Sequence, residues 1–304
     1  MLNKILITGS NGLLGQKLVN LFSKIDTYQV FAISRGDNRN ETALQFTYHN
    51  IDITDAKKLE SFIEDIKPQY IINCAAMTNV DECEKEQIKC DLINVKAVET
   101  LVNFAKRYNT HVIHISTDFI FDGENGPYKE DDKPNPINYY GLSKLKAEEI
   151  IVQNEIKYTI LRTILVYGIV DNMSRNNIVS WVKSAIENKQ QITIVDDQFR
   201  MPTLVDDLAE ACLLAIQNKA YGIYNVSSNE LLSIYEMALQ IAEVFDLDAS
   251  YIKAIPTSQL NQLAKRPPKT GFVLDKSRNN LKFFALPFKD RLQVFKNQLL
   301  NSNN

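Results

Sequence analysis

Three glycines near the start of the chain constrain its fold more than any other feature. Gly9, Gly12 and Gly15 stand three residues apart, directly after residues 4–8, a run of apolar and β-branched side chains. Such a run is typical of a strand buried on both faces of a parallel sheet. Apolar residues with helical spacing follow at Leu13, Leu14, Leu18, Val19 and Phe22. The segment therefore predicts a strand, a tight turn and a helix in succession.

This turn also predicts a ligand. The first glycine allows the chain to reverse, the second lets the backbone approach a ligand, and the third lets the helix pack on the strand. Free N–H groups at the helix start form a positive site that suits a pyrophosphate. A turn with a purely structural role is the alternative. The dinucleotide site that we expect consists of Gly9, Ser10, Asn11, Gly12, Leu13, Leu14 and Gly15.

Composition limits the class of protein. The 304 residues, 45% of them hydrophobic, suffice for one large domain or two modest ones. The four cysteines lack C-x-x-C spacing, which favours reduced thiols in the cytoplasm. We see no signal-peptide pattern and no apolar run long enough to cross a membrane. A net charge of -3 gives no overall basic field for nucleic acid or an anionic membrane surface.

Strand and helix patterns alternate along the first half of the chain. Strands are expected at 29–34, 46–51, 70–76, 111–116 and 158–162, and helices at 55–66, 91–108 and 139–154. Further helices are expected at 177–188, 205–217, 233–245 and 289–300, and further strands at 191–195, 223–226 and 252–255. The alternation predicts an α/β protein with a Rossmann-like, doubly wound parallel sheet.

The pattern also suggests two parts. We place a dinucleotide-binding core at 1–168 and a smaller C-terminal substrate-binding lobe at 169–304, with segments of about 191–226 returning to the core.

The ends of two strands indicate which dinucleotide binds. An acidic residue after the second strand would bind the ribose 2′-hydroxyl of NAD, but this chain has Ser34 and Arg35 there. An arginine favours a 2′-phosphate, so NADPH is the expected cofactor, with NADH as the alternative. If Arg35 is only a solvated loop charge, this preference disappears. After the fourth strand, the small residues Cys74, Ala75 and Ala76 leave room beside a cofactor.

Tyr140 and Lys144 form a candidate catalytic pair. They are four residues apart on a predicted helix and so share a face. Lys144 is expected to lower the phenol pKa from about 10, which would make Tyr140 a general acid at neutral pH. The spacing alone arises by chance, but the pair follows a fifth strand that ends in the hydroxyls of Ser116 and Thr117.

Two other polar clusters have structural interpretations. Asp81, Glu82, Glu84 and Glu86 lie at the start of a predicted helix, where carboxylates suit the helix dipole better than a metal. His111 and His114 are three apart on a strand, so they point to opposite faces and cannot share a metal. We expect both histidines in the core or at an edge, and we predict no metal site.

The combined motifs resemble the dTDP-4-dehydrorhamnose reductase family of extended short-chain dehydrogenase/reductases. The likeness covers nearly the whole chain. It is carried by residues 8–15, 73–76, 116–118, 121–123, 161–163, 166–168, 197–199, 202–203, 266–267 and 274–275, together with Tyr140 and Lys144.

This resemblance implies NAD(P)H-dependent reduction of the 4-keto group of a nucleotide-linked deoxysugar, with conversion of dTDP-4-dehydrorhamnose to dTDP-rhamnose as the first expectation. Thr117 would hold the C4 oxygen, Tyr140 would protonate it, and Lys144 would bind the nicotinamide ribose. Asp52 and Ile53 would hold the adenine. The expected substrate-binding residues are Thr78, Val80, Asp118, Phe119, Leu165 and Arg200.

The chain departs from the family pattern near the sugar. Met77 and Phe119 stand where tyrosines are usual, and Leu165 stands where a tryptophan is usual. The loss of two hydroxyls and an indole changes hydrogen bonding and stacking, which leaves the identity of the deoxysugar open. Candidates for binding the substrate diphosphate are Arg175, Arg200 and Arg266.

Other activities share this scaffold. A dehydratase would need a glutamate after Asp118, where this chain has Phe119, so elimination lacks one acid/base partner. An epimerase could use the same tyrosine and threonine. The beta subunit of methionine adenosyltransferase resembles these reductases in fold and dinucleotide binding, which makes a non-catalytic regulatory subunit the rival from another class. A homodimer, bridged by a metal in some family members, is a further expectation that no sequence feature tests.

Overall fold

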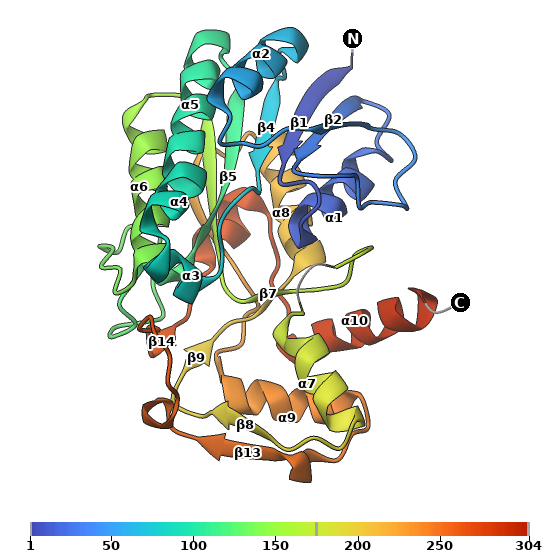
Figure 1. The fold of residues 1–304 in the computed structure, drawn as a ribbon, viewed down its shortest axis with the longest axis vertical. Helices are drawn as coiled ribbons and strands as arrows, with labels where there is room; N and C mark the ends of the chain where they lie inside the picture. Colours follow the sequence, from blue (N-terminus) through green and yellow to red (C-terminus); the bar gives the residue numbers. More distant parts are fainter. Residues whose placement is uncertain (1, 174–175, 303–304) are drawn as a thin grey trace.

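A parallel sheet of seven strands forms the larger part of the molecule (Figure 1). The computed structural model describes residues 2–173 and 176–302. The strand order is β11-β6-β5-β4-β1-β2-β3. The strands are β1 (Asn3–Thr8), β2 (Tyr28–Ser34), β3 (Thr47–Asn50), β4 (Tyr70–Asn73), β5 (His111–Thr117), β6 (Tyr158–Thr163) and β11 (Gly222–Val226). The predicted Rossmann-like α/β fold is therefore confirmed.

The strand order reverses at β1, which pairs with β2 on one side and with β4 on the other. Open parallel sheets bind ligands at such a switch point, outside the carboxyl ends of the strands. Thr8 at the end of β1 lies beside Asn73 at the end of β4. The glycine turn that follows Thr8 is thus placed at the switch point.

Helices cover both faces of the sheet because its strands are apolar on both sides. Ile5 and Ile7 of β1 pack in the cluster that includes α1 (Leu13–Phe22) and α8 (Val205–Gln217). Leu6, which points the other way, packs in the cluster of α2 (Ala56–Ile66) and α5 (Ala97–Tyr108). All three side chains are fully buried. Helix α6 (Tyr139–Gln153) lies beside α5 on that second face (Figure 1).

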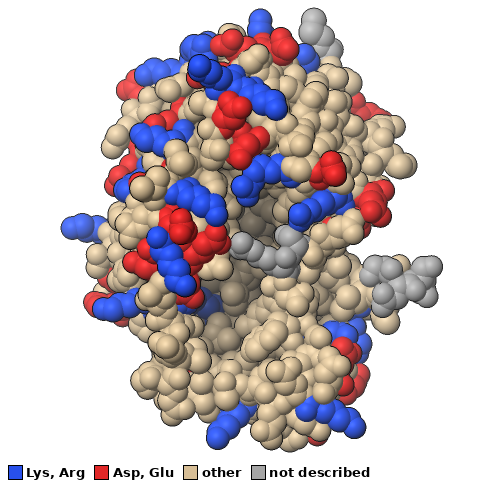
Figure 2. Space-filling view, viewed as in Figure 1, with Lys and Arg blue, Asp and Glu red and all other residues tan. Residues whose placement is uncertain are grey.

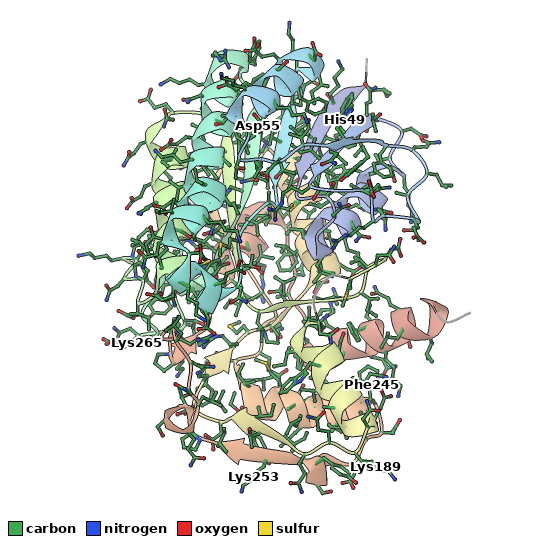
Figure 3. All side chains as sticks on the ribbon, in the orientation of Figure 1. His49, Asp55, Lys189, Phe245, Lys253 and Lys265 are labelled. Carbon is green, nitrogen blue, oxygen red and sulfur yellow. The ribbon has the colours of Figure 1, made fainter. Side chains whose placement is uncertain are left out.

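The start of α2 shows how a local sequence signal fixes a helix. The carboxylate of Asp55, labelled in Figure 3, accepts a hydrogen bond of 3.1 Å from the N–H of Lys58 and caps the helix. Such a cap satisfies an N–H group that has no partner within the helix. On the neighbouring edge strand β3, the ring of His49 packs 4.5 Å from that of Phe62 of α2. The sequence therefore places α2 over the outer strands.

The long helix expected at 91–108 is interrupted. The chain forms α3 (Val80–Lys85), α4 (Gln87–Asp91), a π-helical turn η1 (Leu92–Lys96) and then α5. The π turn lies where the amide of Asn94 is buried: it accepts from the N–H of Met77 at 2.8 Å and donates to the hydroxyl of Ser143 at 2.9 Å. These contacts tie the helix to the chain after β4 and to α6.

A second hydrophobic cluster builds the smaller part of the molecule, below the sheet in Figure 1. It contains α7 (Ile178–Glu187), α9 (Ile234–Val244), α10 (Phe288–Ser302) and a parallel pair formed by β8 (Ile192–Val195) and β13 (Ile252–Ile255). The segment expected to return to the core, at about 191–226, is shared between the two parts of the molecule. Its β8 belongs to this smaller part, and only α8 and β11 pack with the large sheet.

Short elements connect the two parts. The short strands are β7 (Val166–Tyr167), β9 (Phe199–Arg200), β10 (Thr203–Leu204), β12 (Leu232–Ser233) and β14 (Lys269–Thr270). The remaining short turns are η2 (Asp118–Ile120), η3 (Ala249–Tyr251), η4 (Thr257–Gln259) and η5 (Ser277–Leu281). Across the described residues, we find no helix long and apolar enough to span a membrane.

Candidate functional site

A cleft of about 1160 Å³ opens at the carboxyl ends of the central strands, and Figure 2 shows a hollow on this face of the molecule. Its volume exceeds the 300–1,000 Å³ that is usual for a single small ligand. Among the predicted site residues that the structure describes, only Ser10, Arg200 and Arg266 are absent from the lining. The turn, the strand ends and the Tyr140 helix, which lie far apart in the sequence, therefore meet at one cavity.

Two glycines of the turn, Gly9 and Gly15, have no space for a side chain. Gly9 has a φ of +64°, and a Cβ there would lie 2.7 Å from the backbone nitrogen of Ala75. A Cβ on Gly15 would lie 2.3 Å from the carbonyl oxygen of Gly9. Helix α1 begins after Gly12 with no side-chain cap and no acidic residue in its first turn, and its first residues line the cleft. The helix start thus fits an anionic group such as a pyrophosphate.

Ser10 lies beneath this turn. It is buried, it is absent from the cleft lining, and its N–H donates to the carbonyl of Ile33 at 3.1 Å. Its backbone therefore helps to hold the turn against β2, and its side chain does not reach the cleft.

Thr117 and Tyr140 meet across two elements. Thr117 ends β5, where its hydroxyl donates to Oδ1 of Asp118 at 3.1 Å, while Tyr140 lies in the first turn of α6, and both residues line the cleft. Asn138 caps α6 by accepting from the N–H of Gly141 at 2.9 Å. A Cβ on Gly141 would lie 2.0 Å from the carbonyl oxygen of Phe119, so only glycine lets the helix start approach the end of β5 this closely.

The predicted effect of Lys144 on Tyr140 is not what the structure shows. Burial raises the pKa of the Tyr140 phenol above 10, and the neighbouring Thr117 side chain opposes this effect only in part. The neighbouring carboxyl of Asp118 raises the pKa further. The sequence spacing predicted the shared helix face but not the desolvation of the phenol, which has the largest effect on its pKa. The phenol accordingly keeps its proton at neutral pH.

Lys144 is fixed from behind by buried polar groups. Its Nζ lies 3.1 Å from Nε2 of His114, whose Nδ1 lies 3.1 Å from Nδ2 of Asn73. Oδ1 of Asn73 accepts from the hydroxyl of Thr8 at 2.6 Å. Burial lowers the pKa of Lys144 to about 8, while the carboxylate of Glu148 opposes this effect. Burial also lowers the pKa of His114 well below its usual range, so this imidazole is neutral.

His114 is thus a core residue, as expected, and it also contacts the candidate catalytic lysine. His111, by contrast, forms a hydrogen bond between its Nε2 and the hydroxyl of Thr159, 2.8 Å away. The strand alternation that separated the two histidines could have suggested that one of them faces the helix carrying Lys144. Within the described part of the chain, no three His, Cys, Asp or Glu side chains gather as a metal site.

Arg200 does not take the place expected for a diphosphate ligand. Only 3% of its surface is exposed, and its guanidinium donates to the carbonyls of Phe199 and Pro267, both at 2.7 Å. Its Nε lies 3.7 Å from a carboxylate oxygen of Asp118, which also accepts from the Thr270 hydroxyl. Arg200 therefore ties the smaller part of the molecule to the strand end that carries Thr117.

Arg266 gives no free diphosphate ligand either. Arg266 donates to both carboxylate oxygens of Asp81, at 2.9 and 2.8 Å. This pairing lowers the pKa of Asp81 to about 2. Arg175 lies outside the described residues. Asp81 and Glu82 occupy the first turn of α3, as expected, whereas Glu84 lies near the end of this helix and Glu86 follows it as the C-cap.

The three departures from the family pattern lie around the same end of the cleft. Met77 is 6% exposed and packs with Cys83 and Cys90 against Tyr140. The ring of Phe119 lies edge-on to that of Tyr140, with centroids 5.9 Å apart. Leu165 lines the cleft with a φ of +41°, which is uncommon for a branched side chain and marks a strained position.

Sequence reasoning missed two residues of the site. Arg39 lines the cleft together with Arg35, four positions before it in the chain. Asn94 holds the backbone of Met77 from the π turn. Arg39 could have been found, because it is a second basic residue in the loop after β2. Asn94 could not, because the sequence of a π turn has no regular spacing of apolar residues that would reveal it.

The sheet order, the glycine turn and the group formed by Thr117, Tyr140 and Lys144 define a dinucleotide-fold protein of the short-chain dehydrogenase/reductase type. One family model, described as the RmlD substrate binding domain, matches residues 3–301. The chain belongs to this family.

Similar proteins include members of two different kinds. The chain is 33% identical to methionine adenosyltransferase 2 subunit beta of Xenopus tropicalis, over 83% of this chain and 75% of that protein. It is 32% identical to dTDP-4-dehydrorhamnose reductase of Aggregatibacter actinomycetemcomitans, over 90% and 91% of the two chains. A crystal structure of dTDP-4-dehydrorhamnose reductase from Bacillus anthracis in complex with NADP superposes with a TM-score of 0.84 at 28% identity, covering 98% of this chain and 100% of that one.

Proposed function

We propose that this protein is an oxidoreductase that uses NADPH to reduce the 4-keto group of a nucleotide-linked deoxysugar, with dTDP-4-dehydrorhamnose as its first candidate substrate. The observation that carries the proposal is that Thr117, Tyr140 and the buried Lys144 line one cleft together with the glycine turn. Relatives named as dTDP-4-dehydrorhamnose reductases, one of them in complex with NADP, support the same reaction.

The protonation states suit a reduction. A bound dihydronicotinamide supplies the hydride, and the carbonyl oxygen then needs a proton. Because burial raises the pKa of Tyr140, this phenol stays protonated and can donate to the C4 oxygen. The Thr117 hydroxyl, in the same cleft lining as Tyr140, holds the same oxygen and stabilises the negative charge that develops on it.

Lys144 supplies the positive charge at this site. With a pKa of about 8, Lys144 carries the ammonium form in most molecules at neutral pH. The ammonium favours the phenolate that remains after Tyr140 has given up its proton. Lys144 is therefore the group that limits the energetic cost of proton donation, and it would also bind the nicotinamide ribose.

Absorbance at 340 nm tests this proposal directly. Purified protein is mixed with NADPH and a panel of 4-keto-6-deoxysugar nucleotides that vary in base and sugar. We expect NADPH oxidation with at least one dTDP-linked member of the panel. Binding of NADPH without turnover of any member would overturn the proposed reduction.

A regulatory role is the second candidate, because relatives at 33% identity are named as a subunit of methionine adenosyltransferase. Under this alternative the cleft binds a dinucleotide, and the protein acts on a partner enzyme instead of a sugar nucleotide. Titration of a purified methionine adenosyltransferase catalytic subunit, followed by sedimentation, separates the candidates. A stable complex together with the absence of 4-keto-sugar turnover would favour the regulatory role.

A further inference from the structure

The loop after β2 carries two arginines at the cleft. Arg35 and Arg39 both line the cavity and are exposed, whereas Asp37 between them does not line it. Among the residues that the structure describes, neither guanidinium forms an ion pair. Two exposed cations on one short loop repel each other, so their approach needs an anion between them or a backbone that holds them in place.

The side chain of Asn11, in the glycine turn, holds that backbone. Its Nδ2 donates to the carbonyl oxygen of Asp37 at 2.8 Å and to that of Arg35 at 3.2 Å. Its Oδ1 accepts from the N–H of Arg39 at 3.0 Å. One amide therefore binds the backbone of both arginines and fixes the loop against the pyrophosphate turn.

Two residues of β3 hold the same loop from the other side. The hydroxyl of Tyr48 donates to the carbonyl of Gly36 at 2.5 Å, and Oδ1 of Asn50 accepts from the N–H of Gly36 at 3.0 Å. Gly36 has a φ of +74° and no neighbour within 4 Å of a Cβ, so its role is the left-handed turn and not close packing. The loop is thus shaped before any ligand enters.

We propose that Arg39 is a second cation for a phosphate on the adenosine ribose, and that Asn11 is the positioning residue that presents Arg35 and Arg39 to it together. Planar guanidinium forks bind phosphate oxygens in pairs, and a fixed loop lowers the ordering cost of binding. The inference rests on the proposed function in one respect, namely that the dinucleotide is NADPH. Asn11 then sets the preference for NADPH over NADH.

A purely structural role of Asn11 predicts a different outcome. The two dinucleotides share the pyrophosphate, the adenine and the nicotinamide, and they differ only in the 2′-phosphate. If Asn11 only shaped the glycine turn, its loss would weaken both dinucleotides equally. If it positions the arginines, its loss weakens NADPH more than NADH.

The experiment measures the Kd of NADPH and of NADH by nicotinamide fluorescence for wild type and three single variants. Arg39→Ala is expected to raise the NADPH Kd about 10- to 100-fold, the usual range for a hydrogen bond to a charged group. Arg39→Ala should leave the NADH Kd within about 2-fold, whereas Asn11→Ala, a change within the glycine turn, should raise the NADPH Kd about 10-fold more than the NADH Kd. The matched control is Asn38→Ala, because the Asn38 side chain bonds only within the loop, to the backbone of Asn40.

Two further variants, a double and a triple substitution, test whether Asn11 acts through the arginines. In an Arg35→Ala/Arg39→Ala background, Asn11→Ala should change the NADPH to NADH ratio no further, because the groups that it positions are gone. Equal losses for both dinucleotides, or an undiminished effect in that background, would overturn the positioning role. If Asn11→Ala does not fold, an unchanged NADPH Kd in Arg39→Ala refutes the second cation by itself.

These outcomes separate the inference from the proposed reduction. Binding is measured without a sugar nucleotide, so a protein that prefers NADPH through Asn11 but reduces no 4-keto sugar would refute the reduction alone. Equal affinity of the wild type for both dinucleotides would refute the inference alone, because NADH could still serve as the reductant.

Discussion

Replacement of Lys144 by methionine should stabilise the protein while removing its proposed activity. The lysine side chain is only 3% exposed, and its pKa falls from 10.5 to about 8 in the folded state. Carrying the ammonium into the core therefore costs about 3 kcal/mol of folding free energy at pH 7. Methionine fills a similar volume without a charge, but it leaves Nε2 of His114 without a partner, which costs about 1 kcal/mol. The net expected gain at pH 7 is about 2 kcal/mol.

The pH dependence makes this prediction specific to Lys144. Between pH 8 and 10.5 the unfolded lysine binds a proton that the folded lysine has lost, so wild-type stability rises with pH in this window. The cost of the ammonium falls from about 3 kcal/mol at pH 7 to about 1 kcal/mol at pH 9.5. Denaturant unfolding of both proteins at the two pH values measures the difference.

A matched control lies on the same helix. Lys146 forms an ion pair of 3.2 Å with Asp91 and is 37% exposed. Lys146→Met should give no gain in stability at pH 7 and no such change with pH. The reasoning is refuted if Lys144→Met is less stable than wild type at pH 7, or if its stability difference from wild type is the same at both pH values.

Three further substitutions test separate parts of the site and the core. Tyr140→Phe should cut turnover by about 10² or more while dinucleotide binding stays nearly unchanged, and unaltered turnover in a steady-state assay would remove the phenol from the mechanism. Gly15→Ala should prevent the turn from forming, because its Cβ would lie 2.3 Å from the carbonyl oxygen of Gly9; retained dinucleotide binding in a fluorescence titration would contradict this. Glu148→Gln should cost about 3–5 kcal/mol in urea unfolding, because Arg162, 2.7 Å away and 3% exposed, would keep a buried charge without its partner; a loss below 1 kcal/mol would speak against this ion pair.

Local sequence patterns were sufficient for most of the fold. The strand of residues 4–8 and the helix of residues 205–217 are predicted from apolar runs and helical periodicity, because each buries whole faces against the sheet. The π turn that interrupts the helix expected at 91–108 could not be predicted in this way. The π turn at Asn94 is stabilised by Met77 and Ser143, 17 and 49 positions away, so its cause is tertiary.

In the candidate site, too, local sequence predicted some features, whereas others depend on residues that are distant in the chain. Spacing predicted that Tyr140 and Lys144 share a face, and both line the cleft. The environment of each group depended on residues far along the chain. From the sequence, Arg200 is a candidate phosphate ligand, but in the structure its partners are the backbone of Pro267 and the carboxylate of Asp118. Likewise, the pKa of Tyr140 is governed by burial, which no local pattern contains.

Some expectations stay predictions. The division into parts at 168, the roles of the individual site residues, a homodimer and a cytoplasmic location all follow from the sequence or from the family resemblance. Sedimentation equilibrium of the purified protein would test the homodimer, with a mass near twice 34.7 kDa as the expected result.

The fate of the transferred hydrogen tests the central claim most directly. Incubation with dideuterated [4-²H₂]NADPH and dTDP-4-dehydrorhamnose, followed by mass spectrometry of the sugar nucleotide, shows whether the hydride reaches the sugar. A product that carries one deuterium at C4, formed in step with NADPH oxidation and lost in Tyr140→Phe, is the expected result. A sugar nucleotide without deuterium would contradict the account, whether the sugar is epimerised or left unchanged.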